Sequence, residues 1–425
     1  MKKFLAMLLA LVMALSLVAC GEKKDDTQGD GDGDATAAKV KVGFITLHDE
    51  QSTYDLNFIN GAKEAIANLG LTEDDYILKT NVPEGQECYE TAMDMVDNGC
   101  NIIFADSFGH EPYMIDAAKE NPDVQFCHST GTRAHTEGLA NYHNAFASIY
   151  EGRYLAGIAA GMKLNEMIEA GKFTAEEAKM GYVGAFTYAE VVSGYTSFYL
   201  GAKSVCPTVT MEVTFTGSWY DETLEKTGAE LLIDRGCKLI SQHADSFGAP
   251  TACQNAGVPN VSYNGSTKNV GADTYIISSR IDWAPYYEYA IKAVMDGTAI
   301  DADWTGTLAT GSVVLEELNT DVAAAGTAEA IEAAKAKLES GELHVFDVST
   351  FTTKADDTMN TFKVDFLKVD ENGHITSYLA DVDTDEAYTG DTEVVHDGYF
   401  AESEKRSAPY FDLQIDGIEL LNTAM

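Results

Sequence analysis

The sequence is poor in basic residues. Of its 425 residues, 28 are Lys or Arg and 68 are Asp or Glu, which gives a formal net charge of −40. A surface that binds nucleic acid or anionic lipid needs a basic patch that displaces counterions. The composition therefore argues against both kinds of partner. A charge this far from zero is instead typical of a protein that stays soluble outside the cell.

Motifs of common catalytic and metal sites are also absent. The chain has no G-x-S-x-G elbow, no Walker A loop, no H-E-x-x-H and no G-x-G-x-x-G after an expected strand. Its seven cysteines include no C-x-x-C pair, which leaves buried free thiols and disulfides both open. The spacing of His128, His135 and His143 fits no standard zinc site. The stretch HADS at 243–246 places its side chains in different directions, unlike a catalytic triad. We therefore expect no enzyme, no metal and no cofactor.

An apolar run lies at the N-terminus. FLAMLLALVMALSLVA at 4–19 follows two lysines and is too short for a membrane-spanning helix with normal flanks. No second apolar span of membrane length follows. The run ends in LVAC, which resembles the lipobox of bacterial lipoproteins and implies that Cys20 is lipidated; an ordinary signal peptide with a chance cysteine is the alternative. We expect residues 1–19 to be a signal peptide, and the mature chain to be held at the outer face of the cell membrane by its lipid alone.

The rest of the chain divides by composition and periodicity. Residues 20–38 are expected to form an acidic, flexible tether, since no large apolar side chain follows Cys20 there. From KVGFITL at 41–47 onward, short apolar runs alternate with helical patterns, which is typical of crossover units in a parallel sheet. We expect the first part of lobe 1 over 39–165, lobe 2 over 166–265 and a return through the hinge over 266–425. The last range also holds the remainder of lobe 1 and an acidic C-terminal extension, with a hairpin around the turn DENG.

Acids, amides and aromatic rings follow nearly every expected strand. In an open parallel sheet, such strand ends meet helix N-termini and form ligand sites. A single Asp there could simply cap the next helix, and a single ring could belong to the core. One ring from each lobe with carboxylates beside it, however, is what a cleft needs to clamp a flat heteroaromatic ligand. We expect Tyr54 and Trp219 to stack on the ligand, and Asp55, Asp221 and Asp245 to accept hydrogen bonds. The wall is expected to be completed by Asp106, His243 and Asn264.

Several stretches resemble the basic membrane protein (BMP) family of solute-binding lipoproteins, which serve ABC importers. They run in order from about residue 40 to 315 and comprise GFIT to STYD, PDVQFCHSTG, EGRYLAGIAAG, KMGYVGAFTYAEVVSGYTSFYLGAKSV, TGSWYDETLEK, LISQHADSFGAP and DWAPYYEYAIKAV followed by DGTAIDADWTGTLATG. The resemblance implies an α/β protein with the type I periplasmic-binding-protein fold, in which two Rossmann-like lobes joined by a hinge close on a solute. It also implies a purine base or purine nucleoside as that solute.

The resemblance assigns individual positions in the site. Tyr54 takes the place of a stacking Phe and Asp55 that of an Asn, whereas Gln51 replaces an Asp. Trp219 falls where the second stacking ring is found. A Lys of the nucleoside binders corresponds to Ile281, and its loss leaves a free base such as adenine as plausible as a nucleoside.

The sequence thus predicts an extracytoplasmic, monomeric solute-binding lipoprotein that passes a purine base or nucleoside to an ABC permease. Domain closure is the expected mechanism, because the ligand would touch both lobes only in the closed form. One alternative is a receptor that senses the same solute and reports to a membrane signalling protein. Another is a surface enzyme that acts on a small solute.

Overall fold

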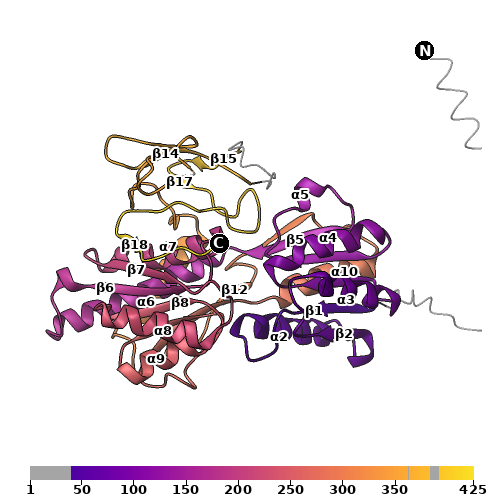
Figure 1. Cartoon of the computed structure of the whole chain (residues 1–425), viewed down its shortest axis with the longest axis horizontal. Coiled ribbons are helices and arrows are strands. Elements are labelled where there is room, and N and C mark those ends of the chain that lie inside the picture. Colours follow the sequence, from indigo (N-terminus) through magenta and orange to yellow (C-terminus); the bar gives the residue numbers. More distant parts are fainter. Residues whose placement is uncertain (1–39, 362, 383–391) are drawn as a thin grey trace, which may run out of the picture. The chain divides into compact units, whose positions relative to one another are not determined.

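A computed structural model of the chain describes residues 40–361, 363–382 and 392–425. The expected signal peptide, the expected lipidation site Cys20 and the expected tether lie outside these residues. The described residues fall in one compact unit, Ala38–Met425, which is built on two sheets with helices packed on them (Figure 1).

The first sheet belongs to the first lobe and has six strands, all parallel. In chain order, the elements of this lobe are β1 (Val42–Ile45), α2 (Thr53–Asn68), η1 (Glu73–Asp75), β2 (Tyr76–Lys79), α3 (Gln86–Asp97), β3 (Ile102–Ala105), η2 (Phe108–His110), α4 (Glu111–Glu120), β4 (Gln125–Ser129), α5 (Ala134–Glu137), β5 (Tyr142–Ala147), α10 (Ala284–Asp296) and β11 (Asp303–Gly306). The strand order is β11-β5-β4-β3-β1-β2. Helices α2 and α10 cover one face, and α3 and α4 cover the other. Because β1 and β3 are buried on both faces, each reads as an unbroken apolar run.

The second sheet belongs to the second lobe and has seven strands. Its elements are α6 (Ile149–Glu169), η3 (Ala175–Glu177), β6 (Lys179–Gly184), α7 (Ala189–Val205), β7 (Thr210–Phe215), α8 (Glu222–Asp234), β8 (Leu239–His243), α9 (Gly248–Ala256), β9 (Asn260–Tyr263), β10 (Tyr275–Ile281), β12 (Val313–Leu315), α11 (Thr327–Glu339) and β18 (Ile418–Leu420). The order is β12-β10-β9-β8-β6-β7-β18, and every pairing except that of β12 is parallel. Each lobe therefore presents the carboxyl ends of its parallel strands along one edge.

The described chain crosses between the lobes from β5 to α6, from β10 to α10 and from β11 to β12. These crossings lie near residues 148, 282 and 307–312, whereas the sequence placed the lobe boundaries at 165 and 265. The difference arises because α6 packs on α7 of the second lobe, and because β10 hydrogen-bonds to β9 and β12. Three adjacent connections of this kind form the hinge.

Helices α6 and α7 approach each other closely enough for backbone contact. A Cβ atom on Gly157 of α6 would lie 2.1 Å from the carbonyl oxygen of Phe198, and one on Gly201 of α7 would lie 2.0 Å from that of Tyr154. Only glycine leaves room for such an approach. The small residues of EGRYLAGIAAG thus fix α6 to the second lobe.

The C-terminal extension, defined here as residues 348–425, also packs on the second lobe. Its short strands are β13 (Leu367–Val369), β14 (Ile375–Ala380), β15 (Thr392–Glu393), β16 (Val395–His396) and β17 (Tyr399–Phe400). Strands β13 and β14 pair antiparallel on either side of the turn DENG. Tyr378, Phe400 and Phe411 belong to the same apolar cluster as α6 and α7, and β18 pairs with β7. Figure 1 accordingly shows β14 and β17 of the extension above α7.

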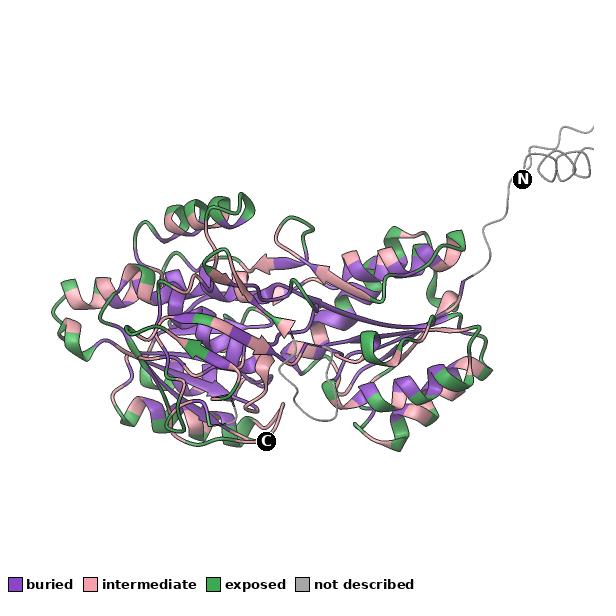
Figure 2. Ribbon diagram, turned by 90° about the horizontal axis from the view of Figure 1, so that it is seen from above, coloured by how far each residue is buried: buried purple, intermediate pink, exposed green. Residues whose placement is uncertain are grey.

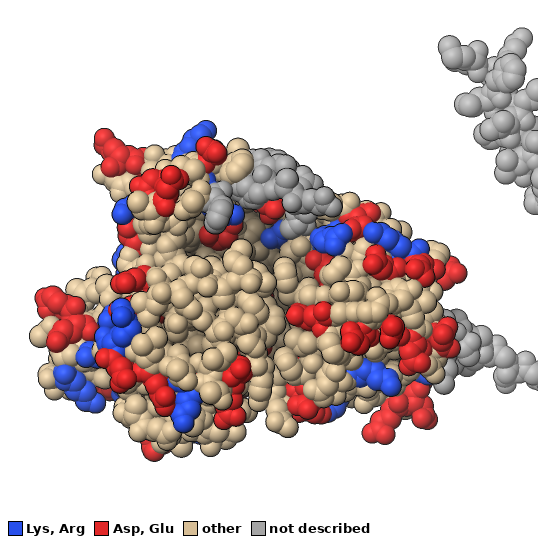
Figure 3. Space-filling model, viewed as in Figure 1, with Lys and Arg blue, Asp and Glu red and all other residues tan. Residues whose placement is uncertain are grey.

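The interior of each lobe is apolar and its surface is acidic. Buried residues lie mainly on the strands and on the inner helix faces (Figure 2). On the face drawn in Figure 3, the scattered Lys and Arg side chains lie among more numerous Asp and Glu. No helix in the described ranges is long and apolar enough to cross a membrane. Within the same ranges, no group of three or more His, Cys, Asp or Glu residues could hold a metal ion. The described cysteines are free and buried, namely Cys88, Cys100, Cys127, Cys206, Cys237 and Cys253.

Candidate functional site

A cavity lies where the carboxyl ends of the strands of the two lobes face each other. We call it the cleft cavity; its volume is about 20 Å³, and it is lined by Leu47, His48, Tyr54, Asp55, Ser107, Phe108, Thr130, Glu190, Trp219, His243 and Asp245. The first seven residues follow β1, β3 and β4 of the first lobe, and the others follow or end β6, β7 and β8 of the second. Loops beyond parallel strand ends are the usual ligand site of such sheets. The cavity therefore lies where the sequence predicted one.

Direct contacts join the lobes around this cavity. The backbone N–H of Thr53, at the start of α2, donates to the carbonyl oxygen of Asp245 at 3.0 Å. The side-chain amide of Asn57 donates to the carbonyl oxygen of Asn264 at 2.6 Å. Two ring pairs add to these bonds, with centroids 5.5 Å apart for His48 and Tyr220 and 5.2 Å apart for Phe108 and Tyr188. The structure thus shows the two lobes in contact over the cavity.

Tyr54 and Asp55 occupy the first turn of α2. The hydroxyl of Tyr54 donates to the carbonyl oxygen of Asp106 at 2.8 Å, which holds its ring at the cavity wall. The carboxylate of Asp55 accepts hydrogen bonds from the backbone N–H of His48 at 2.7 Å and from the Ser52 hydroxyl at 2.5 Å. Burial on its own would raise the pKa of Asp55, but the His48 ring, 3.4 Å from the carboxylate, and the two hydrogen bonds outweigh burial and lower the pKa. Asp55 is therefore an ionised hydrogen-bond acceptor.

Asp106 lies directly behind Asp55 and has the opposite protonation preference. Its side chain is 1% exposed, and its Oδ1 accepts from the backbone N–H of Leu47 at 3.1 Å. Burial raises its pKa well above the ordinary value, and the charge of Asp55 and a hydrogen bond to Asp55 raise it further. Two adjacent carboxyl groups cannot both ionise cheaply in a buried site. The two pKa shifts therefore favour an ionised Asp55 beside a protonated Asp106.

The second lobe supplies Trp219, His243 and Asp245. The ring of Trp219 contacts Phe186 edge-on, with centroids 5.0 Å apart, and its carbonyl oxygen accepts from the backbone N–H of Asp245. Burial lowers the pKa of His243, so the ring is neutral, and its Nε2 lies 3.4 Å from the carboxylate of Glu190. Burial, with nearby Asp55 and other acids, raises the pKa of Asp245 well above the ordinary value. This lobe thus presents an indole ring beside a neutral imidazole and a neutral carboxyl group.

Two predicted residues lie away from the cleft cavity. Asp221 is the N-cap of α8, where its carboxylate accepts from the backbone N–H of Leu224 at 2.9 Å. Helix capping, the alternative weighed for any single Asp, is its observed role. Asn264 lines a neighbouring cavity of about 360 Å³ beside Arg280, although its side chain hydrogen-bonds to Asp245. The structure brings together Tyr54, Asp55, Trp219, His243 and Asp245, with Asp106 behind them.

Sequence reasoning missed several residues of the site. Glu190 lines the cavity from the first turn of α7 and was visible in the strand-end stretch FTYAE, but it was not singled out. His48 and Phe108 were visible in the same way. Arg153 gave a different signal, a cation in the mostly apolar N-terminal half of α6: it is fully buried, and its guanidinium lies 4.7 Å from the centroid of the Tyr263 ring. Tyr263 in turn packs against His243, so Arg153 supports the cavity wall from behind.

Comparison with known proteins identifies the family of this chain. Residues 44–347 match the family model described as Bmp, ABC transporter substrate-binding protein PnrA-like. That match covers well over half of the chain. The chain belongs to the Bmp family. Members of the Bmp family are solute-binding proteins and not enzymes, and they act outside the cytoplasm with ABC importers. This confirms the family that the sequence motifs suggested.

Two relatives of this Bmp chain are 33% identical to it. One is a purine-binding protein of Brucella abortus, matched over 61% of this chain and 70% of that protein. The other is TsgA13 of Haloferax volcanii, named as a candidate ABC transporter glucose-binding protein, matched over 60% of this chain and 62% of that protein. The family match ends at residue 347, so it does not include the C-terminal part of the present chain.

The solved structures confirm the fold of this Bmp protein. An ABC transporter solute-binding protein from Aeropyrum pernix superimposes with a TM-score of 0.60 at 19% identity, over 75% of this chain and 94% of that one. The two sheets described above therefore form the two lobes of the type I periplasmic-binding-protein fold.

Proposed function

We propose that this Bmp protein is a lipid-anchored receptor that binds a purine base or purine nucleoside between its lobes and delivers it to an ABC permease. The observation that carries the proposal is the lining of the cleft cavity. Tyr54 of the first lobe and Trp219 of the second border the same space, together with Asp55 and Asp245. The purine-binding relative from Brucella abortus supports the ligand class.

The protonation states of the acids suit the edge of a purine. Asp55 is ionised and accepts hydrogen bonds, whereas the neutral carboxyl of Asp245 offers one donor and one acceptor, as a side-chain amide does. An amide is the usual partner of the paired donor and acceptor on adenine. Aromatic stacking would supply about 1–3 kcal/mol per ring in addition.

Closure of the lobes is the proposed mechanism of capture. A ligand between Tyr54 and Trp219 would touch both lobes only when they are closed, so its binding free energy favours the closed form. The crossings near 148, 282 and 307–312 are the positions where the backbone would turn. The closed form is then the one that the permease receives.

The lipid anchor rests on the LVAC stretch that ends at Cys20. A Cys20→Ala chain expressed in its host should appear in the soluble extracytoplasmic fraction, while the natural sequence remains with the membrane. Equal retention of both by the membrane would exclude the lipid as the anchor.

The ligand is tested by thermal unfolding of the mature chain, residues 20–425, produced without lipid. Purine bases, purine nucleosides, glucose and amino acids are each added in large excess. A ligand at a hundred times its Kd stabilises a protein by about 2.7 kcal/mol, which raises the Tm by a few degrees. A shift with purines supports the proposal. A shift with glucose alone would favour the activity named for the Haloferax relative and overturn the purine assignment.

A further inference from the structure

One loop of the C-terminal extension reaches the first lobe. The loop spans residues 402–411, and the backbone N–H of Ser407 donates to Oδ2 of Asp303 at 2.8 Å. Asp303 is the first residue of β11, the edge strand of the first sheet. The family match ends at residue 347, so this contact is made by a part of the chain that the match does not include.

Hydrogen bonds within the loop fix its shape. At its base, the carboxyl group of Glu402 accepts from the backbone N–H of Phe411 at 2.9 Å. Inside the loop, the guanidinium of Arg406 donates to the carbonyl oxygen of Pro409 at 2.9 Å. Arg406 and Ser407 are both buried. The closed loop therefore holds the N–H of Ser407 in a fixed direction.

Both flanks of the loop are bonded to the second lobe. On one side, the hydroxyl of Tyr150 on α6 donates to the carbonyl oxygen of Glu402 at 3.1 Å. On the other side, β18 pairs with β7, and beyond β18 the side chain of Asn422 pairs with the backbone of Phe215 at the end of β7. The loop should therefore move with the second lobe.

Asp303 is held in place by its own lobe. Its side chain is 6% exposed, and Nε2 of His135 on α5 lies 3.4 Å from the same Oδ2 that accepts from Ser407. Burial lowers the pKa of Arg406, whereas the charges of Glu402 and Asp303 oppose that effect. Hydrogen bonds to a carboxylate are stronger than those between neutral groups. The contact therefore joins two fixed partners through a bond of the stronger kind.

The contact between Ser407 and Asp303 spans the hinge. Asp303 lies three residues before Gly306, where β11 ends and the chain crosses toward β12. This places Asp303 about 10 Å along the strand from the crossing. Because the loop moves with the second lobe, a rotation at the crossing would separate the N–H of Ser407 from the carboxylate.

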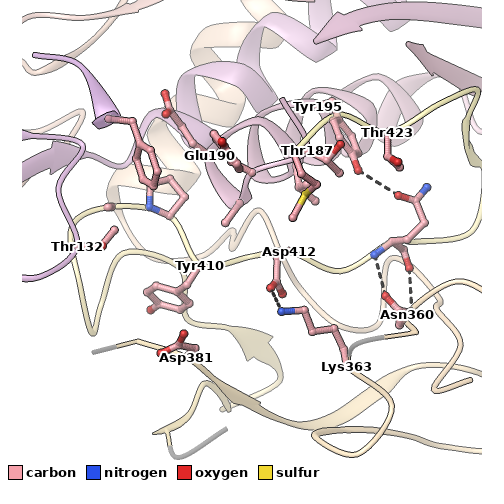
Figure 4. A pocket seen from close by; sticks show the side chains of 18 of the residues that line it. Thr132, Thr187, Glu190, Tyr195, Asn360, Lys363, Asp381, Tyr410, Asp412 and Thr423 are labelled. Carbon is pink, nitrogen blue, oxygen red and sulfur yellow. Dashed lines mark hydrogen bonds and ion pairs between the residues drawn. The ribbon is translucent and has the colours of Figure 1, made fainter. Parts of the chain in front are cut away.

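A cavity beside the loop lets the contact break without disrupting a core. Its volume is about 790 Å³, and Figure 4 shows Thr132 of the first lobe and Tyr410 of the loop at one end of it. Thr130 of the first lobe and Tyr188 of the second line the same cavity. The described residues of the extension and of the first lobe thus face each other across open space here. Separating the lobes would expose little apolar surface on this side.

We propose that loop 402–411 is a latch between the lobes: it is carried by the second lobe, holds Asp303 of the first, and favours the closed arrangement over an open one. The inference rests on the lobe closure proposed above, and it does not depend on which solute is bound. A contact made only in the closed form shifts the equilibrium toward that form. A bound solute should leave more slowly, because the latch must break before the lobes separate.

The test measures the separation of the lobes without solute. Residues 20–425 carry Cys20→Ser together with Ala67→Cys in α2 and Glu230→Cys in α8, two exposed positions. A spin label is attached to each introduced cysteine, since the described natural cysteines are buried. Pulsed electron paramagnetic resonance gives the distribution of distances between the labels, and thermal unfolding checks that each variant is folded.

Two variants remove the latch, one from each side. Asp303→Ala removes the acceptor, and Ser407→Pro removes the N–H donor. Asp301→Ala, at an exposed position just before β11, is the control for the first. Ser407→Ala is the control for the second, because it keeps the backbone N–H and removes a hydroxyl that has no partner among the described residues. If Ser407→Pro fails to fold, Asp303→Ala alone decides the test.

We expect the natural sequence and both controls to show mainly one short distance, that of the closed arrangement. Each latch variant should raise the ratio of long to short distances by about tenfold or more, as expected when a hydrogen bond to a charged group is lost.

Other distributions would overturn the latch. It is overturned if folded Asp303→Ala matches the natural sequence, if Asp301→Ala opens as far as Asp303→Ala, or if a long distance dominates in the natural sequence. Addition of adenine or adenosine to Asp303→Ala tests the proposed function separately. A return to the short distance would support purine capture, whereas no response to either compound would leave the latch standing and count against a purine ligand.

Discussion

Three buried carboxyl groups in the cleft have different protonation states because their neighbours differ. Asp55 receives hydrogen bonds from His48 and Ser52, which stabilise its negative charge. Asp106 and Asp245 have fewer such donors, so burial together with the charge of Asp55 keeps them neutral. The ionised Asp55 borders the cavity from the first lobe and the neutral Asp245 borders it from the second, with the neutral Asp106 behind Asp55. This combination explains how a chain as acidic as this one could hold a neutral heterocycle and not a cation.

Trp219 is the residue whose replacement tests the proposed stacking. Trp219→Ala should weaken purine binding by about 1–3 kcal/mol, since a base loses one of its two stacking partners. Trp304→Ala is a matched control, because Trp304 packs on Tyr286 in the first lobe and lines neither cavity. It should lower stability without changing affinity. Titration calorimetry measures the purine affinity of each variant, and thermal unfolding measures its stability. Equal affinities for Trp219→Ala and the natural sequence would eliminate the stacking.

Glu225 should make stability depend on pH. This fully buried carboxyl accepts backbone bonds from Asp221 and Ser246, yet burial raises its pKa from 4.5 to about 7. Between these values the folded chain holds a proton that the unfolded chain has lost. The free energy of unfolding therefore falls as pH rises from 4.5 to about 7, by at most on the order of 3 kcal/mol.

Glu225→Gln removes this titration. The Tm of the variant relative to that of the natural sequence should therefore increase from pH 5 to pH 8. Glu222→Gln, an exposed position on the same helix turn, is the control, and its Tm should follow that of the natural sequence. A constant difference between Glu225→Gln and the natural sequence across this range would contradict the assigned shift.

At the scale of elements, the contact between α6 and α7 depends on glycine. Gly157→Ala should lower the free energy of unfolding by about 1–3 kcal/mol, because its Cβ would overlap the carbonyl oxygen of Phe198. Gly228→Ala in α8 is the matched control, since the nearest atom to its Cβ would be a methyl group of Thr214 at 3.3 Å. There the better helix propensity of Ala should leave stability unchanged or raise it by up to about 1 kcal/mol. Urea unfolding distinguishes the two variants; similar losses would contradict the close approach.

The central strands of the first lobe and the helix α6 show what the sequence can and cannot predict. The runs at 42–45 and 102–105 are buried on both faces, so they were recognisable as central strands of a parallel sheet. The helical pattern at 149–169 was equally clear, but an apolar helix face does not reveal which sheet it will cover. That choice depends on α7, whose packing with α6 is a tertiary contact. The lobe boundary at 165 was therefore misplaced.

The candidate site was predictable to a similar degree. Strand ends could be found from the βα pattern, and five of the eight predicted ligand-binding residues line the cleft cavity. Asp221 could not be separated from a cap by sequence, because capping and ligand binding use the same residue type at the same position. The larger cavity of about 790 Å³, lined by the start of α7 and by the extension, could not be foreseen, since it depends on how the extension packs against α7. Its wall residues are ordinary in type and carry no local signal.

At the scale of the whole molecule, the proposed closure should take up a proton. Closing places Asp245 and Glu190 of the second lobe near Asp55 and Asp106 of the first, and Asp245 also lies near Glu225. In an open form the carboxyl of Asp245 would meet water and return toward its ordinary pKa of 3.8, whereas in the closed form its pKa is raised. Between these two values closure binds a proton, so purine affinity should fall as pH rises, by at most about tenfold per pH unit for each proton taken up.

Asp245→Asn tests this linkage, because an amide cannot titrate. Its purine affinity should change less with pH between 5 and 8 than that of the natural sequence, whatever its absolute value. Asp234→Asn, at the exposed end of α8, should keep the natural pH dependence. Calorimetric titrations in two buffers of different ionisation enthalpy count the protons directly. Proton uptake in the natural sequence that disappears in Asp245→Asn would tie closure to this carboxyl, whereas the same uptake in both would place the proton on another acid of the cleft.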